Sequence, residues 1–179
     1  MDKRDFYDVS IRGMVAYCVM CLENYVLEIY PDLDLAPVLR IAWAIVGDKG
    51  YIDLNANRYM EVIPEYLFEF DDYEAAQFDY LTEEEFDMFR QLLNPDDPAL
   101  NLVMLRIYDI VMAYAYFGLP TSPVEAAELV LDVIECLQGH GVPLPDFELV
   151  RGFSFSEYHG WGVHISPEGL SRVLGAGND

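Results

Sequence analysis

The chain has very little positive charge. Its 179 residues include 10 Lys and Arg against 32 Asp and Glu, and only two of the cations are lysines, Lys3 and Lys49. Binding to nucleic acid or to an anionic membrane depends on Lys and Arg, which displace counterions from phosphates. The net charge of −22 therefore argues against nucleic acid and membrane lipid as direct partners. Basic proteins and metal cations remain as candidate partners.

We expect no signal peptide, because charged residues interrupt the first apolar stretch and no cleavage motif follows it. The longest apolar run, residues 99–119, contains Asn101, Arg106 and Asp109, which favours a buried helix over a membrane span. Arg106 and Asp109 lie one helical turn apart, and we expect them to form a structural pair.

Three cysteines without a secretory signal are typical of free thiols in a reducing compartment. We therefore expect a cytoplasmic protein.

No catalytic motif is present: the sequence has no GxSxG, Walker, GxGxxG or protein-kinase pattern. Cys18 and Cys21 form a CxxC, but it lies inside an apolar helical segment and not at a helix N-terminus, so we expect both thiols in the core. His159 and His164 are five residues apart, outside the HExxH spacing, and no third ligand is evident. We therefore expect no enzymatic activity, no cofactor and no specific metal site.

The alternative function is a metal-assisted hydrolase. It would use His159 and His164, or the carboxylates of Asp71, Asp72 and Glu74, because a hard cation needs several converging oxygen ligands. These acids do not have the spacing of an EF-hand, which has a central glycine and a terminal glutamate. Tight, stoichiometric metal binding with a large gain in stability would favour this alternative.

Helical periodicity dominates the first 141 residues. Hydrophobic residues make up 53% of the chain, which is enough for a core, and we expect one domain over residues 1–179. Apolar residues recur at three- and four-residue steps, and glycines and prolines mark the ends of the helices. Gly50 and Asn55 predict a loop over residues 47–57. The predicted helices cover residues 5–30, 34–46, 98–117 and 123–139, with shorter helices between them.

The remainder of the chain has a different pattern. After Gly141, prolines and glycines punctuate alternating aromatic residues, which predicts an extended arm or a small β-hairpin over residues 142–165. A Ser-Pro-Glu pattern predicts a short helix over 166–174, followed by a flexible tail over 175–179. The expected fold class is therefore mainly α: a bundle of about five to seven helices over residues 1–141 with a minor C-terminal β element.

Residues 61–97 hold thirteen carboxylates and one cation, Arg90, with eight aromatic rings among them. This segment carries more than half of the net charge of −22. Some of its acids have the spacing of helix starts, in which a side-chain acceptor caps the first turn and acids interact with the helix dipole. The expected helix starts are Asp71 with Glu74, Thr82 with Glu85, and Asp97 with Pro98.

The other acids of this segment have no evident local role and too few cations to pair with, so we expect them to bind a basic partner. Interleaved tyrosines are favoured interface anchors. A second group of carboxylates shares one face of the helix over 123–139 and is either a second docking surface or a solvated face. The candidate partner-binding residues are Glu61, Glu65, Glu69, Asp72, Tyr73, Asp79, Tyr80, Glu125, Glu128, Asp132 and Glu135.

Together these features favour an acidic, non-catalytic protein that binds a basic protein. The concrete form we expect is an immunity protein, an inhibitor that neutralises a nucleic-acid-cleaving toxin, because the active sites of nucleases are basic and an acidic surface can occupy them. An adaptor or assembly protein without an inhibitory role is a further alternative, and the sequence leaves the oligomeric state open.

Overall fold

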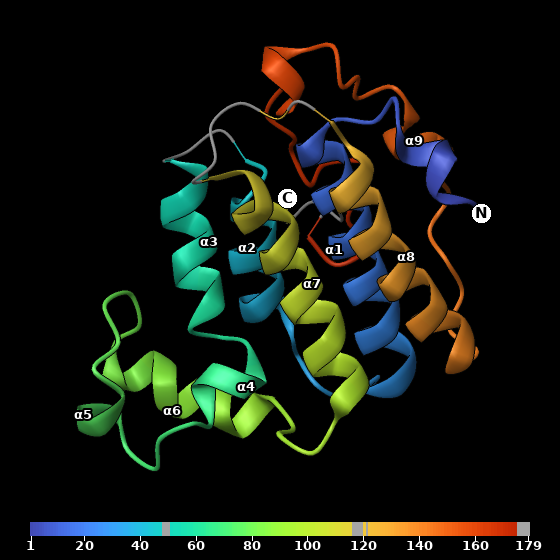
Figure 1. The fold of residues 1–179 in the computed structure, drawn as a ribbon. Helices are drawn as coiled ribbons and strands as arrows, with labels where there is room; N and C mark the ends of the chain where they lie inside the picture. Colours follow the sequence, from blue (N-terminus) through green and yellow to red (C-terminus); the bar gives the residue numbers. More distant parts are fainter. Residues whose placement is uncertain (48–50, 116–119, 121, 175–179) are drawn as a thin grey trace.

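The computed structural model describes residues 1–47, 51–115, 120 and 122–174. These residues form nine α-helices and two 3-10 helices, with no β-strand among them (Figure 1). The predicted helical bundle is therefore confirmed, and the described part of the chain contains no β-hairpin. The elements are η1 Lys3–Phe6, α1 Ile11–Ile29, α2 Ala36–Ala44, α3 Ile52–Met60, α4 Pro64–Leu67, α5 Tyr73–Ala76, α6 Glu83–Leu92, α7 Pro98–Ala115, α8 Val124–Gly139, α9 Glu148–Arg151 and η2 Tyr158–Gly160.

Helix α1 is the central element of the bundle. Helices α2, α7, α8 and α9 all contact it, and 15 of its 19 residues are buried. The prediction of one helix over residues 5–30 is wrong at its start, because Ser10 caps α1 by accepting a hydrogen bond from the Gly13 amide at 3.2 Å. Residues before this cap form η1, whose own cap is Asp2.

Helices α7 and α8 pack against each other and against α1. Helix α7 is the one helix of the described residues with the length and apolar composition of a membrane span, and it also contacts α3. Its Arg106 pairs with Asp109 at 2.8 Å and with Asp132 of α8 at 2.7 Å. The predicted bundle helix and the predicted structural pair are both confirmed.

Helix α3 occupies much of the segment that was predicted as a loop. Residues 52–60 are helical because Ala56 and Tyr59, three residues apart, are fully buried and share one face. Helix α3 contacts α2 and α7. Asn55 lies within this helix and donates a hydrogen bond to the Ala44 carbonyl at 2.8 Å, while Gly50 lies outside the described residues.

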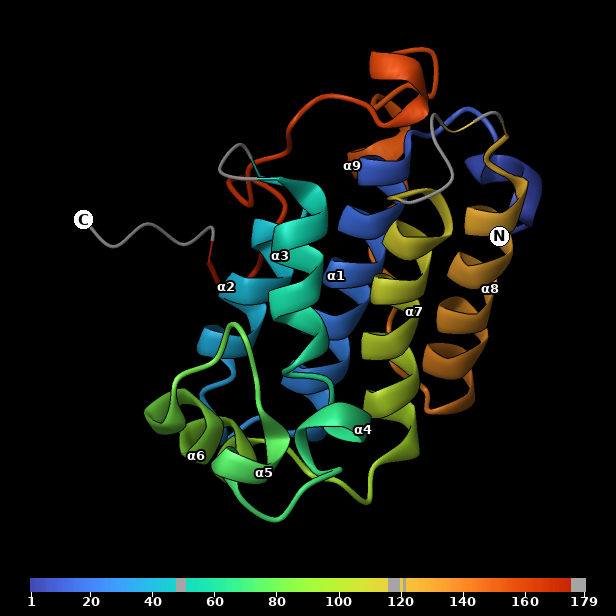
Figure 2. The same cartoon turned by 60° about the vertical axis from the view of Figure 1, so that its left-hand side comes forward.

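Residues 142–174, called the strap from here on, run back over the bundle without forming a hairpin (Figures 1 and 2). Their aromatic side chains pack on the bundle instead of on each other: Phe147 contacts Phe6 and Tyr17, and Trp161 contacts Tyr114. Within the strap, backbone hydrogen bonds form only turns and short helices; the strap reaches other segments through one isolated bridge between residues 9 and 154 and through single hydrogen bonds. The predicted β element is therefore wrong, and in place of a continuous extended arm the segment contains α9, η2 and turns.

The strap ends at a buried carboxylate, that of Glu23 in α1. Glu23 accepts hydrogen bonds from the indole of Trp43 at 2.8 Å, from the hydroxyl of Ser171, and from the backbone amide of Arg172 at 2.8 Å. Residues 166–174 contain turns around Ser171 and no helix, so the short helix predicted there is wrong. The predicted tail, residues 175–179, lies outside the described residues.

Candidate functional site

Residues 64–97, called the acidic lobe from here on, contain the helices α4, α5 and α6 and their connections. Figures 1 and 2 show these helices at one end of the bundle, while the part of the strap that follows α9 and includes η2 lies at the opposite end. The buried residues of the lobe, among them Phe86 and Phe89, belong to the same hydrophobic cluster as the bundle. The lobe is thus attached to the bundle through a shared core.

Glu61 fixes the loop between α5 and α6. It follows α3, is only 4% exposed, and accepts hydrogen bonds from the backbone amides of Asp79 at 2.8 Å, Tyr80 at 3.0 Å and Leu81 at 2.9 Å. Glu61 was predicted to be an exposed partner-binding residue without a structural role, and that prediction is wrong. Its neighbours Val62 and Ile63 are also buried, and this apolar context in the sequence is the signal that could have indicated burial.

Aromatic rings form the interior of the lobe. Tyr73 and Phe78 both pack against Phe86, with ring centroids 5.9 Å and 5.8 Å apart, and the Tyr73 hydroxyl donates to the Leu81 carbonyl at 2.7 Å. Tyr73 and Tyr80 are only partly exposed. Tyr73 is therefore partly committed to packing within the lobe itself.

Arg90, the single cation of the lobe, is directed at uncharged groups. Its guanidinium carbon lies 4.7 Å from the centroid of Phe68 and 5.1 Å from that of Phe86. Its Nη1 donates to the carbonyls of Phe70 and Leu67. Arg90 thus stabilises the interior of the lobe, and no ion pair joins it to a carboxylate among the described residues.

Ten carboxylates of the lobe remain exposed to solvent. Within the described residues, the only ion pair that reaches the lobe joins Arg58 of α3 to Glu85 at 2.6 Å, and Glu85 is not one of the ten. The lobe therefore has a dense negative surface with almost no internal compensation. The exposed carboxylates are Glu65, Glu69, Asp71, Asp72, Glu74, Asp79, Glu83, Glu84, Asp87 and Asp96.

Helix capping accounts for part of this charge. Thr82 and Glu85 form the predicted capping box, with reciprocal hydrogen bonds between side chains and backbone. The start of α5 lies one residue later than predicted, because Asp72 and not Asp71 accepts from the Ala75 amide, at 2.8 Å. Asp72 therefore has a local structural role as an N-cap, contrary to the prediction.

Asp97 joins the end of the lobe to the bundle. It is 8% exposed and caps α7 by accepting from the amides of Ala99 and Leu100 at 2.9 Å and 3.0 Å, which confirms the predicted N-cap. It also accepts from the hydroxyls of Tyr25 and Tyr30. These two tyrosines are long-range partners that the local sequence pattern did not indicate.

The acidic stripe of α8 differs from the lobe because cations from elsewhere in the chain reach it. Lys3 pairs with Glu128 at 2.8 Å, and Arg106 pairs with Asp132 at 2.7 Å. Burial opposes the charge of Arg106, but its hydrogen bonds with Asp109 and Asp132 outweigh this effect and raise its pKa. The other two members of the stripe, Glu125 and Glu135, are exposed and have no ion pair in the described residues.

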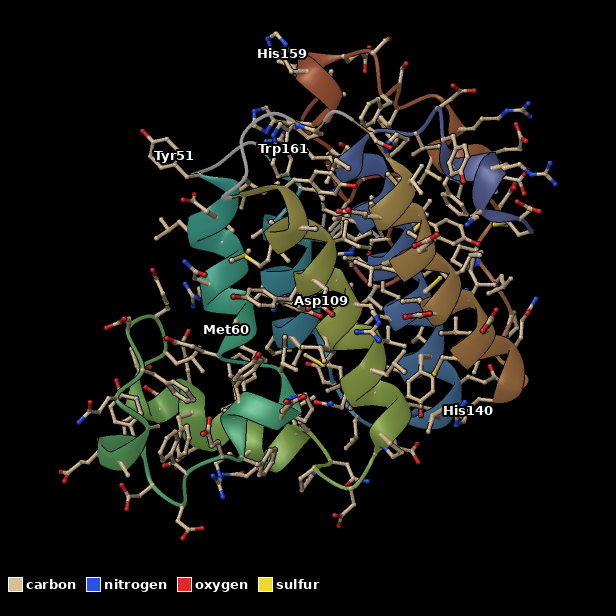
Figure 3. The ribbon with its side chains drawn as sticks, viewed as in Figure 1. Tyr51, Met60, Asp109, His140, His159 and Trp161 are labelled. Carbon is tan, nitrogen blue, oxygen red and sulfur yellow. The ribbon has the colours of Figure 1, made fainter. Side chains whose placement is uncertain are left out.

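His159 of the hydrolase alternative lies far from the carboxylates Asp71, Asp72 and Glu74, which belong to the acidic lobe. His164 Nδ1 lies 2.8 Å from the Gly47 carbonyl, and His159 points outward at the end of the bundle away from the acidic lobe (Figure 3). Over the described residues, no group of three or more His, Cys, Asp or Glu side chains is placed to hold a metal ion.

The two cysteines of the CxxC lie fully inside α1. Burial raises the pKa of the Cys18 and Cys21 thiols, so neither has the properties of a reactive thiolate.

No family model matches this chain, and searches of the curated proteins and of the solved structures give no match either. The interpretation of the acidic lobe therefore rests on its geometry and charge.

Proposed function

We propose that this chain is a non-catalytic binding protein whose acidic lobe docks a basic protein. One observation carries the proposal: ten exposed carboxylates gather on residues 64–97, while the single cation of the lobe is bound to carbonyls and rings. Unpaired charges of one sign repel each other and destabilise the compact state. A basic partner supplies the missing cations, so the lobe is better compensated in a complex than alone.

The lobe acts mainly through long-range attraction. A concentrated negative surface accelerates the encounter with a basic protein by roughly 10- to 1000-fold at low salt. Salt screens this attraction, since the Debye length falls to about 8 Å at physiological ionic strength. The partly paired stripe of α8 contributes less, because Lys3 and Arg106 already neutralise two of its four acids.

The concrete form of this function is an inhibitor of a nucleic-acid-cleaving toxin. A protein surface that binds nucleic acid is basic, so it matches the acidic lobe in charge. Docking of the lobe over such a surface blocks the nucleic acid by steric exclusion and by competition for the same cations. This mechanism requires no chemistry from the lobe, which contains no histidine.

The test is capture from native lysate across a salt series, identification of the retained basic protein, and reconstitution with that protein in purified form. The triple variant Glu69→Lys, Asp79→Lys and Asp87→Lys should weaken the reconstituted complex by about tenfold or more, since each like charge at an interface opposes association. These three side chains are exposed and cap no helix.

The matched control reverses three exposed acids outside the lobe: Asp8→Lys, Asp53→Lys and Glu168→Lys. It changes the net charge by the same amount, so an equal loss of affinity in both variants would show that net charge and not the lobe determines binding. If the reconstituted complex forms but a nuclease partner keeps its activity, the inhibitory form of the proposal fails and a docking function without inhibition remains.

A further inference from the structure

A groove crosses the acidic lobe where α4 approaches the turn that leads into α7. Its walls include Pro64, Pro95 and Pro98, and its volume is about 550 Å³. Pro64 and Pro98 are the first residues of α4 and α7, so helical backbone fixes the position of each ring. This proline groove is therefore preformed, and binding in it orders few flexible groups.

Two carboxylates give the proline groove its charge. Glu65 and Asp96 line it, and both are exposed. Asn101 orients Glu65, because its amide nitrogen donates to Glu65 Oε2 at 3.3 Å and its amide oxygen accepts from the Glu65 backbone amide at 2.9 Å. No ion pair involves either carboxylate in the described part of the chain. A cation is the charged group that matches this pair.

The aromatic part of the groove is Phe68. The lobe already uses this ring to hold a guanidinium, that of Arg90, at 4.7 Å from the centroid. A planar guanidinium both stacks on an aromatic ring and hydrogen-bonds carboxylates, whereas an ammonium group is more strongly hydrated and does not stack. An anionic group is repelled here, and a purely apolar group would desolvate Glu65 and Asp96 without compensation.

We infer that the proline groove binds an arginine side chain of the basic partner, with its guanidinium between Glu65 and Asp96 and against Phe68. This inference rests on the proposed function, and it names the point at which the lobe anchors its partner. The other exposed acids of the lobe then attract the partner at long range, while the groove selects arginine over lysine at short range.

The test is an NMR titration of the isotopically labelled protein with a blocked peptide of alternating glycine and arginine, at about 0.15 M ionic strength. Two otherwise identical peptides carry lysine, which keeps the charge, or citrulline, which keeps the planar shape without the charge. The arginine peptide should bind about 2- to 5-fold tighter than the lysine peptide. Its binding should shift the backbone amides of Phe68, Asp96 and Asn101.

The protein variants separate the groove from the general charge of the lobe. Glu65→Gln with Asp96→Asn should weaken binding of the arginine peptide by about 5- to 30-fold, through the loss of two charge-assisted contacts. Glutamine at position 65 keeps an acceptor for Asn101. The matched pair Glu84→Gln with Asp87→Asn removes the same charge from α6 and should leave the affinity within about twofold.

Each contrary outcome has a distinct meaning. If both cationic peptides bind equally and both pairs of substitutions weaken binding equally, the groove inference fails while diffuse docking on the lobe stands. If neither peptide binds, yet the lysine substitutions at Glu69, Asp79 and Asp87 weaken the reconstituted complex, only the groove inference fails. If those substitutions also leave the complex unchanged, the proposed function fails with it.

Discussion

Replacing Asp97 by alanine should lower the free energy of unfolding by about 3 to 5 kcal/mol. The carboxylate accepts hydrogen bonds from four donors, the hydroxyls of Tyr25 and Tyr30 and the amides of Ala99 and Leu100. Loss of an N-cap costs about 1 kcal/mol. A buried hydroxyl left without an acceptor adds about 1 to 3 kcal/mol, and Tyr25 is 2% exposed.

Two matched variants isolate these contributions. Asp97→Asn keeps an oxygen acceptor and the cap but loses the charge, so it should cost only about 1 kcal/mol. Asp96→Ala alters the neighbouring exposed acid, whose side chain makes no hydrogen bond in the described residues, and should change stability by less than about 0.5 kcal/mol.

The effect of Asp97 also depends on pH with a defined sign. Desolvation opposes its ionisation, but hydrogen bonds from Tyr30, Leu100, Tyr25 and Ala99 together outweigh it and lower the pKa of this carboxyl. Its contribution is therefore complete above the unfolded-state value of about 3.9 and is lost as the pH falls through the lower folded-state pKa. The difference between the wild type and Asp97→Asn should stay constant from about pH 7 to 5 and shrink below about pH 4.

The assay is urea denaturation followed by tryptophan fluorescence and circular dichroism, repeated at several pH values. A loss below about 1 kcal/mol for Asp97→Ala would refute the role of Asp97 as a junction between the lobe and the bundle. Equal effects at Asp96 and Asp97 would refute it as well, because burial is what distinguishes the two acids.

Two further buried carboxylates lead to related predictions. Glu61→Gln should lower the free energy of unfolding by about 1 to 3 kcal/mol, because one amide oxygen replaces two charged acceptors for three backbone amides. In the same denaturation assay, the exposed control Glu69→Gln should stay within about 0.5 kcal/mol of the wild type. Glu23→Gln should speed hydrogen exchange at the Arg172 amide while leaving α7 protected, because the strap loses its charged acceptor. Unchanged exchange at Arg172, or an equal change in the exposed Glu28→Gln, would contradict the second prediction.

Local signals in the sequence predicted local structure well. The capping box of Thr82 and Glu85, the N-cap at Asp97 and the end of α8 at Gly139 all depend on atoms within a few residues of each other. Ser10 is a signal of the same kind that was missed, because the apolar periodicity around it continues across the cap. Helix α3 was missed because its apolar face is short and gains its burial from α7, a distant part of the chain.

The residues of the site were harder to predict, because their environment is set by long-range contacts. Glu65, Glu69 and Asp79 are exposed as expected, whereas Glu61 bonds to amides about twenty residues later in the chain. In the sequence, only the apolar neighbours Val62 and Ile63 set Glu61 apart from the other acids. The proline groove likewise arises from residues 64–68 and 95–101, which only the fold brings together.

The buried carboxylates explain how so acidic a chain folds with few cations. Among the described residues three acids are buried, Glu23, Glu61 and Asp97, and none of them forms an ion pair. Each accepts hydrogen bonds from amide, hydroxyl or indole groups, which are uncharged donors. Such donors satisfy a carboxylate without neutralising it. The fold therefore needs little internal positive charge, and the negative charge of the acidic lobe stays largely uncompensated within the described residues.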